Sequence, residues 1–160
     1  MARVSFRVLT GGGSLVTFAG HYAIPEILEQ IRSAAPDMKY WWELSVKHNG
    51  PTVRMHSQHV YVKWKPLLWF VKGSRVNSAL DFMSDYIESQ PTDKIMHEWE
   101  QSTVEAEHVI SALTVENQTV LDPLMGSGTT GVAALKLKRK FIGIEIGMQH
   151  FQIARNRPIT

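Results

Sequence analysis

The most constraining feature of the chain is a glycine-rich turn between a short apolar strand and a helix. Residues 120–135 read VLDPLMGSGTTGVAAL, so Gly126, Gly128 and Gly131 follow the pattern G-x-G-x-x-G. Glycine adopts backbone angles that other residues avoid and lets a ligand approach the main chain. The unpaired N–H groups at the start of the helix favour an anionic or polar ligand group. The turn therefore predicts a binding site. Because no Gly-Lys-Ser/Thr follows it, hydrolysis of nucleoside triphosphates is disfavoured.

An acidic residue on the next predicted strand strengthens this prediction. The sequence FIGIEI places Glu145 near the end of the strand that follows the helix. In a β-α-β unit this carboxylate lies at the tip of the neighbouring strand, where it can accept hydrogen bonds from both hydroxyls of a ribose. The turn and the acid together indicate a site for a cofactor that contains a nucleoside. The alternative is a tight structural turn beside a solvated glutamate.

Hydrophobic patterning predicts strands and helices in alternation. The predicted strands are 14–19, 40–46, 59–64 with 67–71, 119–121 and 141–146, and the predicted helices are 24–34, 79–87, 103–113, 129–137 and 148–155. Residues 1–9 fit a strand or the end of a helix equally well. Alternation of this kind is typical of an α/β protein with parallel strand pairs. No linker composition divides the chain into two domains.

Composition excludes several classes of protein. The absence of cysteine excludes disulfides, thiol catalysis and thiolate metal sites. The 17 basic residues against 15 acidic residues allow a nucleic-acid partner without requiring one. No apolar stretch has the length of a membrane span or the features of a signal peptide, which predicts a cytoplasmic protein that does not enter a membrane. His56 and His59 have H-x-x-H spacing, but no third ligand is nearby, so we predict no metal site.

The turn and the strand after it together resemble a known family. VLDPLMGSGTTGVAAL followed by RKFIGIEI is similar to the S-adenosylmethionine-binding half of DNA amino-methyltransferases, which methylate the exocyclic amine of adenine (N6) or cytosine (N4). The resemblance implies an α/β fold with a Rossmann-like, S-adenosylmethionine-dependent methyltransferase sheet, circularly permuted and incomplete, and it implies DNA as a partner. The cofactor-binding residues that it implies are Asp122, Pro123, Leu124, Gly126, Ser127, Gly128, Thr129, Thr130, Glu145 and Ile146.

The same resemblance assigns a role to each part of this set. Residues 122–128 would surround the amino-acid end of the cofactor, and Thr129 and Thr130 would cap the helix and reach the same end. Glu145 would hold the ribose, and Ile146 would lie against the adenine. The family usually has Phe where this chain has Leu124, which predicts weakened affinity for the cofactor.

The resemblance covers most of the chain, which we interpret as one methyltransferase-like domain of three segments. Residues 1–72 resemble a remnant of the half that binds the target base, 73–102 a connecting segment, and 103–160 the cofactor-binding half. The sequence HEWEQS, at 97–102, resembles the segment that closes over the cofactor in the permuted members.

The catalytic motif of that family, (D/N/S)-P-P-(Y/F/W), is absent from this sequence, and no catalytic residue is assigned. In the family its polar side chain and a main-chain carbonyl orient the target amine, and its aromatic ring stacks on the flipped base. None of the 7 prolines is adjacent to another. The resemblance therefore implies a truncated member without its central strand, which would expose two unpaired sheet edges. Residues 4–9 could replace that strand, a second chain could supply it together with the motif, or the chain could fold poorly. We expect little or no turnover from this chain alone.

Basic residues lie among tryptophans in the middle of the sequence, a pattern that suits a nucleic-acid groove. The candidates for contact with DNA are Lys47, His48, Lys63 and Lys65. The alternative is a core of tryptophans between solvated lysines. A second basic run, 136–140, is expected mainly to stabilise the C-terminus of a helix. Two other functions are alternatives: a non-catalytic module that binds S-adenosylmethionine or DNA and needs a partner subunit, and an unrelated nucleotide-binding protein such as a dehydrogenase.

Overall fold

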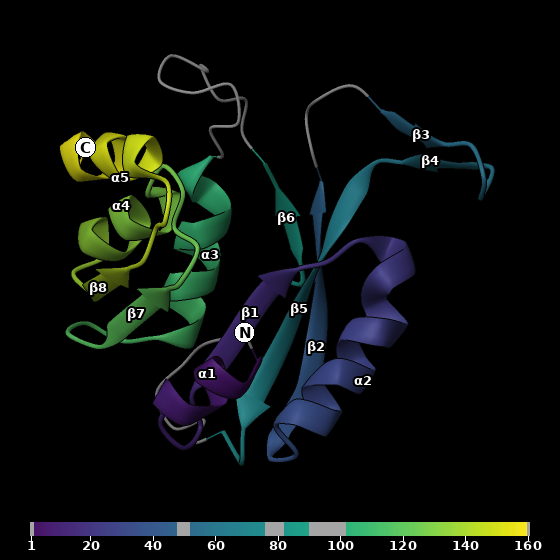
Figure 1. Cartoon of the computed structure of the whole chain (residues 1–160), viewed down its shortest axis with the longest axis horizontal. Helices are drawn as coiled ribbons and strands as arrows, with labels where there is room; N and C mark the ends of the chain where they lie inside the picture. Colours follow the sequence, from purple (N-terminus) through teal and green to yellow (C-terminus); the bar gives the residue numbers. More distant parts are fainter. Residues whose placement is uncertain (1, 48–51, 76–81, 90–101, 160) are drawn as a thin grey trace. The chain divides into compact units, whose positions relative to one another are not determined.

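The computed structural model describes residues 2–47, 52–75, 82–89 and 102–159. The chain divides into two compact units (Figure 1). The first unit comprises Met1–Ala79 and Ser84–Glu88, and the second comprises Leu80–Met83 and Ser89–Thr160. Each unit is described by itself.

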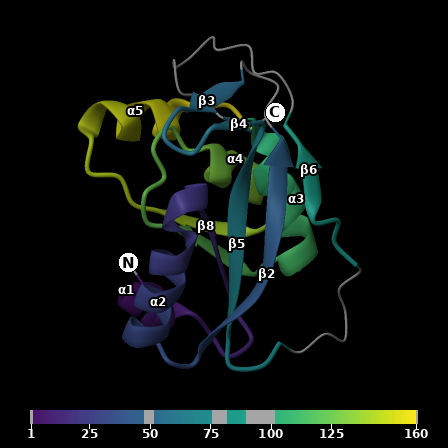
Figure 2. The ribbon, with the colours of Figure 1, turned by 90° about the vertical axis from the view of Figure 1, so that its right-hand side faces the viewer.

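A four-stranded mixed sheet forms the centre of the first unit. Its strands, in spatial order, are β1 (Ser14–Phe18), β5 (Trp64–Lys72), β2 (Met38–Lys47) and β6 (Tyr86–Glu88). The β1–β5 and β2–β5 pairs are antiparallel, and the β2–β6 pair is parallel. Figure 2 shows β2 and β5 side by side as the two long strands. The prediction of parallel pairing is therefore correct for only part of this sheet.

Strand β5 runs without a break through Pro66, where the sequence predicted an interruption. Pro66 is paired with Ser45 of β2, whereas the β1 pairing ends at Leu67. The Pro66 carbonyl accepts a hydrogen bond from the Ala19 N–H at 3.0 Å. Because the N and the C=O of one residue face the same side of a strand, the proline nitrogen faces the side where β1 has ended. The missing donor therefore removes no ladder bond to β2.

Two helices pack beside this sheet. Helix α2 (Ile24–Ala34) follows a short 3₁₀ helix, η1 (His21–Ala23), and has Pro25 in its first turn, where the absent N–H costs no hydrogen bond. The predicted apolar face of α2 is confirmed, since Ile31 is buried against Leu68 and Phe70 of β5.

Helix α1 (Ala2–Val8) settles the ambiguity of the N-terminal segment, in which residues 2–8 are helical and do not form a replacement strand. Lys72 Nζ donates to the carbonyls of Phe6 and Leu9, both at 2.7 Å, and lies 4.5 Å from the centre of the Phe6 ring. The ammonium group therefore satisfies carbonyls at the C-terminal end of this helix, where a positive charge is favourable.

A two-stranded ribbon extends from β2 and β5, away from the four-stranded sheet (Figure 1). It consists of β3 (Val53–Met55) and β4 (Val60–Val62) in antiparallel pairing. At its tip His59 has φ 53°, in the left-handed region. Most of its side chains are exposed, and Arg54 lies 5.4 Å from the centre of the Tyr61 ring.

The second unit contains a β-α-β arrangement with two further helices. Its elements are α3 (Thr103–Leu113), β7 (Thr119–Asp122), α4 (Thr129–Lys136), β8 (Lys140–Gly143) and α5 (Met148–Asn156). Strands β7 and β8 are parallel, as predicted. The core joins Ile110 of α3 to Ala133 and Ala134 of α4, with Phe141 partly buried against them.

Arg139 fixes the short connection between α4 and β8. Its guanidinium donates to Thr114 Oγ1 at 2.9 Å, to the Thr114 carbonyl at 2.6 Å and to the Leu137 carbonyl. These bonds tie the residues before β8 to the end of α3. They hold β8 in place beside β7. The position of Glu145, which follows β8, depends on this placement.

The predicted helix over 79–87 is wrong in its described part. Residues 86–88 instead form β6, which is parallel to the end of β2. Ile87 is buried, and the Ser45 N–H donates to the Asp85 carbonyl at 2.7 Å. Tyr and Ile favour strands, and pairing with β2 decides the conformation of so short a segment.

Candidate functional site

The glycine turn begins where β7 ends. Asp122 Oδ1 accepts a hydrogen bond from the Leu124 N–H at 3.0 Å, a local bond that turns the chain directly after the strand. Pro123 is the first residue of that turn. Gly126 and Gly128 both have positive φ, 53° and 82°. The sequence prediction that these glycines supply unusual backbone angles is therefore correct.

Glu145 lies beside this turn, as the β-α-β prediction required. Its Oε2 accepts a hydrogen bond from the Gly126 N–H at 3.0 Å, and its Oε1 accepts one from the Gly147 N–H at 2.7 Å. The carboxylate thus connects the turn after β7 to the segment after β8. Hydrogen bonds that favour the charged form, first from Gly147 and then from Gly126, hold the pKa of Glu145 below its ordinary value of 4.5.

The main-chain hydrogen bonds between β7 and β8 continue beyond the ends of the two strands and place Glu145 beside the turn. The Ile144 N–H donates to the Asp122 carbonyl at 2.9 Å, and the Met125 N–H donates to the Ile144 carbonyl at 3.0 Å. These main-chain bonds fix the two strand tips to each other. The position of the carboxylate therefore follows from backbone pairing as well as from its own contacts.

Open space and exposed apolar side chains surround the turn. A Cβ placed on Gly126 would have no atom within 4 Å. Leu124 is 71% exposed and Ile146 is 101% exposed. Backbone N–H groups, a carboxylate beside them and two uncovered apolar side chains fit a ligand that has a polar end, a sugar and an aromatic base.

Gly128 and Gly131 allow close packing around α4. A Cβ on Gly128 would lie 2.9 Å from the Ala154 Cβ of α5. A Cβ on Gly131 would lie 2.7 Å from the Phe141 ring. These two glycines let α5 and β8 approach α4 closely.

The predicted capping role of the two threonines is wrong. Helix α4 begins after Gly128, which is the N-cap residue in the left-handed conformation and provides no side-chain cap. Thr129 and Thr130 are the first two residues of the helix, beyond the capping position. Ser127 lies on the turn before them.

The described candidates for contact with DNA lie at the adjoining ends of β2 and β5, where Lys47 is paired with Trp64, between Lys63 and Lys65 in the chain. Lys47 pairs with Glu88 at 2.6 Å across the β2–β6 pair, and both side chains are about half exposed. The side-chain hydrogen bond to Glu88, and then the negative charge of Glu88, raise the pKa of Lys47. Lys63 and Lys65 are exposed beside the ribbon. His48 lies outside the described residues, as do residues 97–101 of HEWEQS.

The basic run at the end of α4 is mostly engaged with the protein. Lys136 lies 3.2 Å from Glu107, and Lys138 lies 3.3 Å from Glu116, while Arg139 bonds Thr114 and Leu137. In the described part of the chain, no three His, Asp or Glu residues are grouped as metal ligands. Every helix within the described ranges is too short or too polar to cross a membrane.

Sequence reasoning missed two residues that shape this site. Gly147 donates the shorter of the two bonds to Glu145, and its place two residues after the acid was the available signal. Arg157, beyond α5, bonds to the glycine turn. The sequence gives no local signal for Arg157, because this contact joins residues about thirty positions apart.

Comparison with known proteins agrees with this geometry. A family model described as DNA methylase matches residues 2–156. The type II methyltransferase M2.LlaDCHI of Lactococcus lactis subsp. cremoris is 53% identical over 51 residues, which cover 32% of this chain and 19% of that protein. The type II methyltransferase M.BglI of Bacillus subtilis is 31% identical over 134 residues, which cover 78% of this chain and 38% of that protein. The chain thus spans well under half the length of these two relatives.

A solved structure extends the agreement to the fold. The crystal structure of the M1.HpyAVI–SAM complex superposes with a TM-score of 0.78 at 27% identity, and covers 96% of this chain and 78% of that one. The sheet strands, the glycine turn and the acid beside it all fall within the matched range of the family model. This chain belongs to the DNA methylase family.

Proposed function

We propose that this chain binds S-adenosylmethionine at the glycine turn, as part of a protein that methylates the exocyclic amine of adenine or cytosine in DNA. The observation that carries the proposal is the Glu145 carboxylate, hydrogen-bonded to the Gly126 N–H at the tips of two parallel strands. A carboxylate in this position can accept hydrogen bonds from the two ribose hydroxyls. Membership of the DNA methylase family and the likeness to the M1.HpyAVI–SAM complex support the same cofactor.

Different residues of the site would contact different parts of the proposed ligand. Residues 126–130 would hold its amino-acid end, since the first N–H groups of α4 are unpaired within the helix and attract a carboxylate. The exposed side chains of Leu124 and Ile146 would pack on the apolar parts of the ligand. When bound, S-adenosylmethionine supplies a methyl group on a sulfonium, which an attacking amine displaces. The chain itself contributes binding and orientation.

Calorimetry tests the cofactor directly. We expect saturable heat when the full chain is titrated with S-adenosylmethionine and none with ATP, because the turn lacks the lysine of a P-loop. We also expect none with NAD, because the chain belongs to the DNA methylase family. Thermal unfolding with and without each compound provides an independent measurement of the same binding. Saturable heat with NAD and none with S-adenosylmethionine would move the chain to the dehydrogenase class and refute the proposal.

A non-catalytic role with a partner subunit is the second candidate. It is favoured by the sequence, in which no Pro-Pro pair exists to form the family's amine-orienting motif. In the described residues β1 pairs with β5 alone and β7 pairs with β8 alone, so each has one edge to which a strand of a second chain could add. Methyl transfer to DNA by the purified chain alone would exclude this candidate.

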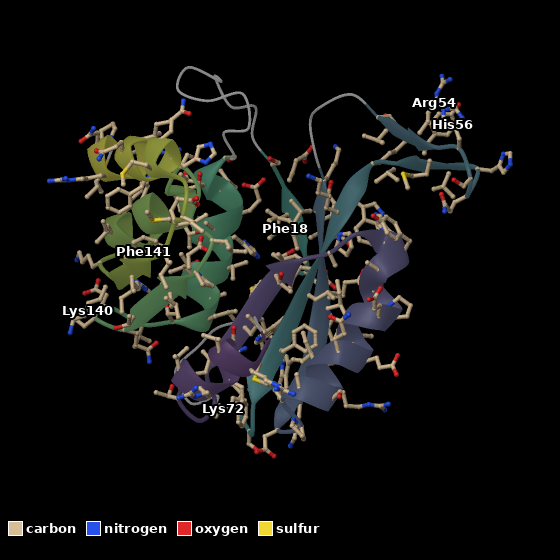
Figure 3. All side chains as sticks on the ribbon, in the orientation of Figure 1. Phe18, Arg54, His56, Lys72, Lys140 and Phe141 are labelled. Carbon is tan, nitrogen blue, oxygen red and sulfur yellow. The ribbon has the colours of Figure 1, made fainter. Side chains whose placement is uncertain are left out.

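We further propose that the β3–β4 ribbon and the adjoining start of β5 contact DNA. Figure 3 shows Arg54 and His56 on the ribbon, away from the sheet. Arg54, Lys63 and Lys65 are exposed and pair with no acid among the described residues, in contrast to Lys47. A two-stranded ribbon fits into the major groove, and cations beside it reach the phosphates.

Neutralising these cations should weaken DNA binding in a salt-dependent way. For the triple variant Arg54→Gln, Lys63→Gln, Lys65→Gln we expect weaker binding to any duplex and a salt slope lower by about 1 per lost phosphate contact. Fluorescence anisotropy over a series of salt concentrations measures both quantities. The matched control is Lys39→Gln, an exposed lysine of β2. An equal effect in the control would place the interface elsewhere.

A further inference from the structure

We propose that Arg157 is a positioning residue that holds the glycine turn in its ligand-binding shape; this inference rests on the function proposed above. Arg157 directly follows α5. Its Nη1 donates to Thr129 Oγ1 at 3.0 Å and to the Ser127 carbonyl at 3.3 Å. A single guanidinium therefore bonds both to the turn and to the first residue of α4.

The peptide between Ser127 and Gly128 is held at both of its polar ends. Its carbonyl accepts from Arg157, and its N–H, which belongs to Gly128, donates to the Met125 carbonyl at 2.9 Å. A peptide beside glycine rotates at little steric cost, because glycine has no Cβ to restrict it. Rotation here would break both bonds and point the Ser127 carbonyl toward the Met125 carbonyl, which is unfavourable. The arginine therefore stabilises the present conformation of the turn.

The charge of Arg157 supports the same role. The N-terminus of a helix carries partial positive charge, so a cation beside it is unfavourable unless an anion is also bound. Arg157 adds its full charge near the start of α4, where it bonds to Thr129. This arrangement is favourable when the ligand group at the turn is a carboxylate, such as the amino-acid end of S-adenosylmethionine.

Open space lies beside the turn. A cavity of about 330 Å³ adjoins it, and its lining includes Gly128, Ala154 of α5 and Arg157 after α5. Close approaches in this region include Ala154 to Gly128 and Phe141 to Gly131. The hydrogen bonds from Arg157 add a directional constraint on the Ser127–Gly128 peptide to this packing.

The test compares two ligands that share the nucleoside. S-adenosylmethionine carries the amino-acid group on a positively charged sulfonium, and 5′-methylthioadenosine is the neutral thioether without that group. For Arg157→Met we expect about tenfold weaker binding of S-adenosylmethionine, from the loss of charge-assisted hydrogen bonds, with binding of methylthioadenosine unchanged. For Arg157→Lys, which keeps the charge but not the planar guanidinium with its several N–H donors, we expect an intermediate loss of affinity for S-adenosylmethionine. Arg155→Met, in the last turn of α5, is the matched control.

Hydrogen exchange provides a readout that needs no ligand. In Arg157→Met the amides of 125–129 should exchange faster, while those of α3 stay unchanged. Equal loss of affinity for both ligands, or unchanged exchange at 125–129, would overturn the positioning role while leaving the cofactor site intact. If Arg157→Met does not fold, Arg157→Lys decides: wild-type affinity and wild-type exchange would overturn the inference. Absence of S-adenosylmethionine binding in the wild-type chain would instead refute the proposed function.

Discussion

Replacing Gly128 with alanine is expected to destabilise the second unit by about 2–4 kcal/mol, the sum of backbone strain and overpacking. The strain arises because φ at this position is 82°, in a region that L-residues with a Cβ avoid. The overpacking arises because the new methyl would lie 2.9 Å from the Ala154 Cβ and 3.2 Å from its Cα, so that α5 would have to move. Hydrogen exchange of peptides from 103–159, read against denaturant, measures the loss.

Gly126→Ala separates the two causes. Its φ of 53° is also left-handed, but a Cβ there meets nothing within 4 Å. We therefore expect only the backbone strain, about 1–2 kcal/mol. Equal losses of stability in the two variants would show that α5 shifts at little energetic cost and that the contact between Gly128 and Ala154 contributes little.

Replacing Glu145 with alanine is expected to weaken binding of S-adenosylmethionine by about tenfold or more, because charge-assisted hydrogen bonds are lost. The substitution removes the acceptor proposed for the ribose. It also leaves the Gly126 and Gly147 N–H groups without their present partner, which loosens the turn. Calorimetry measures the affinity. Glu116→Ala is the matched control, since that carboxylate pairs with Lys138 on the surface. Wild-type affinity in Glu145→Ala would mean that the carboxylate does not touch the ligand.

The pH dependence of Glu145 follows from the direction of its pKa shift. Because hydrogen bonds hold the pKa of the folded state below 4.5, the carboxylate stabilises the fold fully above that value. This stabilisation is lost as the pH falls through the lowered pKa. As the pH falls below 4.5, Glu145→Ala should therefore lose less stability than the wild-type chain. Acid titrations that follow the unfolding of both proteins measure this difference.

The parts of the fold that the sequence predicted well are those with local signals. Helices 24–34 and 103–113 match the structure at both ends. For 24–34 the signal is a clear apolar face with proline in the first turn. For 103–113 the structure adds a cap that the prediction did not use, since the Ser102 side chain accepts from the Val104 N–H at 3.2 Å. Non-local pairing decided the elements that were mispredicted. Strand β6 exists because β2 lies beside it, and Pro66 is tolerated because β1 has already ended.

The candidate site shows the same contrast between features with a local sequence signal and features set by non-local contacts. The nearness of Glu145 to the turn was predictable, because parallel strands joined by one helix bring their tips together. The amides that bind Glu145 were not predictable, since they depend on the path of the chain after each strand. The capping role assigned to Thr129 and Thr130 was wrong because a left-handed glycine begins α4 without any side-chain cap.

The two amides that hold Glu145 bear on turnover as well as on affinity. A methyltransferase has to discard a spent cofactor whose sugar is identical to that of the fresh one, so a carboxylate that relied on the sugar alone would retard product release. Here both carboxylate oxygens have backbone donors when no ligand is present. Departure of the sugar therefore leaves no unsatisfied charge behind. Under the proposed function, the same acid would then bind the incoming cofactor and release the spent one.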